Sequence, residues 1–138
     1  MRKGLALPGW VANFKRRMEA AAVLIVEDDA DTARAVTDAL VDLGYRTVCA
    51  RDGGEALAAL ERERPAVMLV DIFMPGMNGS ELLARVRASL EWSQIPRVIM
   101  TGANDPMIGV KEDAAVLYKP VDIDALRNIV ERYCRPSG

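Results

Sequence analysis

Short apolar runs alternate with helical patterns along most of this chain, and the alternation constrains the fold more than any other feature. The runs rich in Val, Ile and Leu are predicted strands at 23–26, 46–50, 67–70, 97–101 and 115–118. Apolar residues recur at helical spacing in 31–43, 53–64, the segment that Ser80 would cap, and 123–133, with one further helix expected in 102–114. Strands joined by helices pair in parallel through right-handed crossovers. The pattern predicts a flavodoxin-like, doubly wound α/β fold whose five-stranded parallel sheet has the order 2-1-3-4-5 and helices on both faces.

The first 21 residues differ from the remainder. They hold five basic residues and one acidic residue, a net charge of +4 that leaves −6 for residues 22–138. Trp10, Phe14 and Met18 recur every fourth residue, which would form an apolar stripe on a helix. We therefore expect a basic extension at 1–21, with a possible extra helix, and one domain at 22–138. The helix could dock on a partner or an anionic membrane; packing on the domain, or a cloning remnant, is the favoured interpretation.

Composition narrows the classes of function. The balance of 18 basic and 20 acidic residues disfavours a nucleic-acid binder driven by overall charge. There is no histidine, and Cys49 and Cys134 lack metal-ligand spacing, so neither a structural zinc site nor a disulfide framework is expected. No apolar run has membrane-spanning length and no cleavable signal begins the chain, which predicts a cytoplasmic protein.

Polar residues follow four of the predicted strands. Glu27 and Asp28 follow the first strand, Asp71 the third, Thr101 ends the fourth and Lys119 follows the fifth. The carboxyl ends of parallel strands meet at one edge, so these groups should share a crevice. Three carboxylates without histidine or cysteine favour a hard cation such as Mg²⁺. Together with a lysine and a hydroxyl, they are suited to binding a phosphoryl group.

Five segments resemble, in order, the receiver domain of two-component response regulators. They are 23–29 (VLIVEDD), 52–57 (DGGEAL), 71–79 (DIFMPGMNG), 100–102 (MTG) and 118–120 (YKP). The resemblance covers about residues 22–134. It implies that Asp71 is a phosphoacceptor that attacks a phosphohistidine. It also implies that Mg²⁺, or Mn²⁺, is bound by Asp28, Asp71 and the backbone carbonyl of Phe73, with Glu27 acting directly or through water.

The same resemblance assigns three groups to the phosphoryl oxygens: the Thr101 hydroxyl, the Gly102 backbone N–H and the Lys119 ammonium. It makes Pro120 a candidate for a cis peptide bond. In the family, the residues two positions after the aspartate and after the threonine tune hydrolysis of the aspartyl phosphate. Here they are Phe73 and Ala103, which cannot orient a water, so a long-lived phosphoprotein is expected.

The chain departs from the family between Thr101 and Lys119, which are about one helical turn closer in sequence than usual. Pro106 and Gly109 are poor helix formers, so a short or frayed helix is expected there, and the usual output face is in doubt. The family's aromatic switch position holds Val116, with Tyr118 on the same side of the strand.

Other residues have structural interpretations. Asp29 and Asp31 are predicted as helix-capping and first-turn acids, and Gly53, Gly54 and Gly79 as turn residues.

The resulting prediction is a stand-alone response regulator receiver without a separate catalytic output domain. Its partners would be a histidine kinase or histidine phosphotransfer protein and an unknown downstream protein, with membrane contact only through a kinase or, less favoured, residues 1–21. Two alternatives stay open: a Mg²⁺-dependent phosphohydrolase with an Asp nucleophile, and a receiver-like interaction module that takes no phosphate. The hydrolase normally carries a second Asp where this chain has Phe73.

Overall fold

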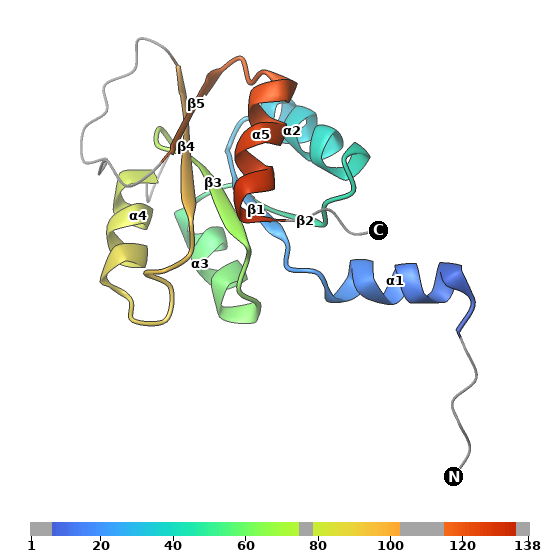
Figure 1. The fold of residues 1–138 in the computed structure, drawn as a ribbon. Helices are drawn as coiled ribbons and strands as arrows, with labels where there is room; N and C mark the ends of the chain where they lie inside the picture. The colour runs from blue at the N-terminus through green and yellow to red at the C-terminus, as the bar shows by residue number, and fades with distance from the viewer. Residues whose placement is uncertain (1–6, 75–78, 103–114, 135–138) are drawn as a thin grey trace.

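The computed structural model describes residues 7–74, 79–102 and 115–134, and for residues 16–19 it describes the backbone alone. A parallel sheet forms the centre of the molecule (Figure 1). Its five strands are β1 (Val23–Val26), β2 (Thr47–Ala50), β3 (Val67–Asp71), β4 (Arg97–Gly102) and β5 (Ala115–Lys119). They lie in the order β2-β1-β3-β4-β5. The predicted fold class and strand order are confirmed.

In the described part of the chain, two helices cover each face of the sheet. Helices α2 (Ala30–Asp42) and α5 (Ile123–Tyr133) pack on one face, and α3 (Gly53–Arg62) and α4 (Gly79–Ala88) on the other (Figure 1). Alternate strand residues serve the two faces: Leu24 and Val26 join the α3/α4 core, whereas Val23 and Ile25 join the α2/α5 core. Because both faces are covered, β1 and β3 are buried along their whole length, which explains their unbroken apolar sequences.

Aspartates begin three of these helices. Asp29, Asp52 and Asp122 are the N-caps of α2, α3 and α5, and each side chain accepts a hydrogen bond from a backbone N–H three residues later. The capping role predicted for Asp29 is therefore confirmed. The cap predicted at Ser80 is wrong, because α4 already begins at Gly79 and Ser80 lies inside its first turn.

A further helix, α1 (Gly9–Glu19), precedes the sheet and extends away from it on the side where β1 begins (Figure 1). Its aromatic side chains do not pack on the domain: Trp10 is 73% exposed and Phe14 59%. Met18, the third member of the predicted stripe, lies among the residues whose side chains are not described. None of the helices that the structure describes is both long and apolar enough to cross a membrane.

The helix predicted within 102–114 lies almost entirely outside the described residues. Ala103, one of the two positions predicted to tune hydrolysis, also lies outside them.

Candidate functional site

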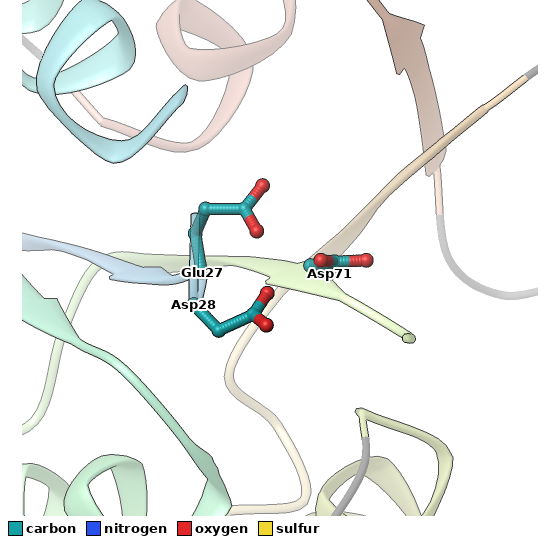
Figure 2. Close-up of side chains that lie close together, drawn as sticks. All are labelled: Glu27, Asp28 and Asp71. Atoms are coloured by element: carbon teal, nitrogen blue, oxygen red, sulfur yellow. The ribbon is translucent and has the colours of Figure 1, made fainter. Parts of the chain in front are cut away.

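The predicted site residues gather at the carboxyl edge of the sheet. Glu27 and Asp28 directly follow β1, Asp71 is the last residue of β3, and the three side chains approach the same space (Figure 2). One carboxylate oxygen from each of the three lies within 4.8 Å of the others. Strand β3 is the neighbour of β1, and this pairing places acids that are 43 or more positions apart in sequence next to one another.

The donor set fits a hard divalent cation. All three side chains offer carboxylate oxygens, which Mg²⁺ and Mn²⁺ prefer. Glu27 is 1% exposed and Asp71 5%, whereas Asp28 is exposed, so the cluster has a buried side and an open side. An ion could enter from the open side and keep some of its water, as Mg²⁺ usually does.

Lys119 contributes the positive charge of the cluster in the structure. Its Nζ lies 2.5 Å from Glu27 Oε1 and 3.2 Å from Asp71 Oδ2. The side chain leaves the end of β5, where the Lys119–Pro120 peptide bond is cis. Among the residues that the structure describes, one ammonium therefore faces three carboxylates, an imbalance that a cation would reduce.

Burial and the ion pair between Glu27 and Lys119 affect the pKa values of these two residues in different ways. Burial, together with the neighbouring Asp71, raises the pKa of Glu27 to about 7, although Lys119 opposes the shift. Burial alone would lower the pKa of Lys119, but its ion pairs with Glu27 and Asp71 outweigh that effect and raise it. Lys119 therefore stays charged, while Glu27 can gain or lose its proton near neutral pH.

The carboxylate of Asp71 is held in a fixed orientation. Its Oδ1 accepts a hydrogen bond from the backbone N–H of Phe73 at 3.0 Å, and its Oδ2 faces Lys119. A short side chain that binds the backbone two residues later forms a tight local turn. The Phe73 side chain that follows this turn is 47% exposed.

Gly79 packs directly against the backbone of Asp71, a role that the prediction of a turn residue missed. A Cβ at Gly79 would lie 2.3 Å from the backbone oxygen of Asp71 and 2.4 Å from Cα of Ile72. The Gly79 N–H also donates to the Ile72 carbonyl at 3.2 Å. Only glycine allows α4 to begin this close to the end of β3. A glycine in the first turn of a helix, where its propensity is poor, was the available signal.

Thr101 and Gly102 end β4, beside β3 and opposite Tyr118 and Lys119 of β5. Thr101 is buried, and its hydroxyl donates a long hydrogen bond of 3.5 Å to the carbonyl of Gly102. Tyr118 is exposed, whereas Val116 packs against the α3/α4 core.

Comparison with known proteins gives a consistent result. A family model described as the response regulator receiver domain matches residues 23–131. The Sporulation initiation phosphotransferase F of Bacillus subtilis is 36% identical over 115 residues, covering 80% of this chain and 91% of the relative. Protein PilH of Pseudomonas aeruginosa is 34% identical over 110 residues, covering 77% and 91%. The chemotaxis response regulator CheY4 of Vibrio cholerae superposes with a TM-score of 0.74 at 31% identity, covering 83% of this chain and 98% of that one.

Proposed function

The chain belongs to the family of response regulator receiver domains, and from this premise we propose that it accepts a phosphoryl group on Asp71 in a two-component phosphorelay. The observation that carries the proposal is the ion pairing of one lysine, Lys119, with both Asp71 and the buried Glu27. That arrangement places a positive charge beside an oriented nucleophile, with two further carboxylates in the same cluster. Residues 22–138 would form the receiver unit.

In the proposed step, a carboxylate oxygen of Asp71 forms a bond to the phosphorus of a phosphohistidine. The bond from phosphorus to the imidazole nitrogen breaks, and its electron pair returns to the imidazole. Lys119 would pair with the transferred phosphoryl oxygens, leaving its present contact with Asp71 Oδ2. The Thr101 hydroxyl and the Gly102 N–H would donate to the same oxygens from the end of β4.

The fit of the acidic cluster supports a metal requirement. Glu27, Asp28 and Asp71, with the Phe73 backbone carbonyl, would hold Mg²⁺ or Mn²⁺, which supplies positive charge that offsets the charge of the phosphoryl oxygens.

A histidine kinase or a histidine phosphotransfer protein is the proposed donor. A cavity of about 340 Å³ between α2 and α5 adjoins the site and is bordered by Lys119 and Pro120. Apolar side chains of Val36, Ile123 and Leu126 line it as well. A partner seated there could present a phosphohistidine at the edge of the sheet where Asp71 lies.

The test is incubation of the protein with acetyl phosphate and Mg²⁺, followed by intact mass measurement. The wild-type chain should gain one phosphoryl group, and the gain should require the metal. Asp71→Asn should abolish it because the nucleophilic carboxylate is lost. Asp31→Asn is the matched control, since Asp31 lies in the first turn of α2 near the site but outside the acidic cluster, and it should still be modified.

The same experiment separates the other interpretations. Modification of Asp71→Asn would refute the assignment of the acceptor. Turnover of a phosphate ester would favour the phosphohydrolase, which the apolar Phe73 disfavours because it cannot act as an acid or base two positions after the nucleophile. A wild-type chain that gains no mass would favour an interaction module that takes no phosphate.

A further inference from the structure

Helix α1 presents an apolar face that is open to solvent in the structure. Leu7 just before the helix is 54% exposed, and Trp10 and Phe14 are more exposed still. The helices of the domain behave differently: α2 and α5 direct apolar residues such as Leu40 and Leu126 into the core. An exposed face with two aromatic side chains is a feature that globular packing does not explain.

Two exposed aromatic residues form an apolar strip on α1. Trp10 and Phe14 are four positions apart, which places them on the same side of the helix, and Leu7 is exposed two residues before the helix begins. The half-buried Val11 borders the strip. Lys15 follows Phe14 directly, and Arg16 and Arg17 come next in the sequence, while the first turn of α1 holds no acid. Exposed aromatic residues at helical spacing, together with basic residues in the same helix, are typical of helices that lie in a membrane interface.

Charge distinguishes this segment from the domain it precedes. Residues 1–21 carry +4 and residues 22–138 carry −6. An anionic surface would attract the segment and repel the domain, which gives the molecule a preferred orientation. Self-association through α1 is less favourable, because it would bring two segments of charge +4 together.

The place where α1 joins the domain agrees with an orientation in which α1 faces the anionic surface. The Arg46 guanidinium holds the segment where it joins the domain, with Nε donating to the Ala20 carbonyl at 3.0 Å while its two terminal nitrogens pair with Glu63. This junction lies at the amino end of β1, whereas Asp71 lies at the carboxyl edge of the sheet (Figure 1). A surface bound by α1 would leave the acidic cluster accessible.

We propose that α1 is an interfacial helix that binds an anionic lipid surface through its exposed apolar strip and its basic residues. A single helix of 11 residues gives weak, reversible binding that depends on lipid charge and on salt. The inference rests on residues 7–20 and holds whether or not Asp71 is phosphorylated.

The test is flotation of the full chain with vesicles of phosphatidylcholine alone or of phosphatidylcholine mixed with phosphatidylglycerol. We expect binding to the anionic vesicles only, reduced by high salt. Trp10→Ala combined with Phe14→Ala should abolish it. Replacing Lys15, Arg16 and Arg17 by Gln should weaken it roughly a hundredfold, about fivefold for each charge. Leu90→Ala is the matched control, because Leu90 is a fully exposed apolar residue elsewhere on the surface, and it should bind like wild type.

A second readout reports on the helix directly. In a Trp92→Phe background, Trp10 is the single tryptophan, and its emission should shift to shorter wavelength on anionic vesicles. Three results would overturn the proposal: no flotation of the wild-type chain at low salt, flotation that survives the aromatic double substitution, or a dimer in solution that this substitution abolishes. The last result would assign the strip to a second copy of the chain.

Discussion

At the scale of single residues, the electrostatics of the site depend on the ion pair between Lys119 and the buried Glu27. Lys119 contacts Glu27 more closely than Asp71, so the residue that is not the proposed nucleophile holds the ammonium most tightly. Glu27 has almost no exposure to water, so burial destabilises its ionised form. The protonation of Glu27 should consequently affect stability near neutral pH.

Glu27 should make the metal-free protein less stable as the pH rises from 6 to 8. Its pKa is about 7 in the folded chain and about 4.5 when exposed, so the folded state binds the proton more tightly and loses that advantage as the pH passes 7. The loss should be roughly 1 kcal/mol. Glu27→Gln should remove this part of the pH dependence, as urea unfolding in the presence of a chelator would measure.

Glu63→Gln serves as the control of opposite sign. The hydrogen bonds from Arg46 lower the pKa of Glu63, so its carboxylate stabilises the fold above its ordinary pKa and this contribution is lost as the pH falls. The Gln variant should therefore be less stable than wild type at pH 8. Equal pH dependence in wild type and Glu27→Gln would contradict the role assigned to Glu27.

Phe73 should slow the hydrolysis of a phosphorylated Asp71. Its side chain is exposed beside the site and has no group that can orient an attacking water. Phe73→Asn would supply such a group and should speed the loss of the phosphoryl mass on the order of tenfold or more. The measurement is intact mass against time after the phosphodonor is removed, with Mg²⁺ present. Phe73→Leu should resemble wild type, and rapid loss from the wild-type chain would contradict the prediction.

At the scale of elements, the close approach of α4 to β3 fixes the position of Asp71. The first residue of α4, Gly79, lies directly against the last residue of β3, Asp71, and its N–H donates to the carbonyl of Ile72, the residue after the strand. The helix therefore acts as a support for the strand end. A displacement of α4 would move the acidic cluster together with the strand.

Gly79→Ala should destabilise the fold and impair modification of Asp71. The added Cβ would meet backbone atoms at 2.3 and 2.4 Å, which cannot move independently of the sheet. We expect a loss of about 1–3 kcal/mol in urea unfolding and slower phosphorylation by acetyl phosphate. Gly9→Ala is the control, because no atom lies within 4 Å of a Cβ there, and it should change neither property. Normal stability of Gly79→Ala would show that α4 does not restrain the strand end.

At the scale of the whole molecule, the regions assigned to the two proposed functions differ in charge and in position. The acidic cluster lies at the carboxyl edge of the sheet, and the basic helix α1 leaves from the opposite edge. The packed domain between them is covered on both faces. Phosphoryl chemistry and the proposed surface binding could therefore proceed without obstructing each other.

The sequence by itself determined the sheet and which residues meet at its carboxyl edge. Periods of two and 3.6 are local properties, so the strands predicted at 23–26 and 67–70 and their order could be derived from the sequence, and with them the position of Asp28, Asp71, Thr101 and Lys119 at one edge. The cap at Asp29 followed from local backbone chemistry in the same way.

Only the tertiary structure decided which of these groups contact one another and how strongly. Lys119 lies closer to Glu27 than to Asp71, burial raises the pKa of Glu27, and there is no room for a Cβ at Gly79. Each of these features depends on distances between segments that are remote in sequence. The exposure of Trp10 and Phe14 is of the same kind, because an apolar stripe is equally compatible with packing and with solvent. Periodicity specifies which face of a helix is apolar, but only the rest of the fold determines whether anything covers it.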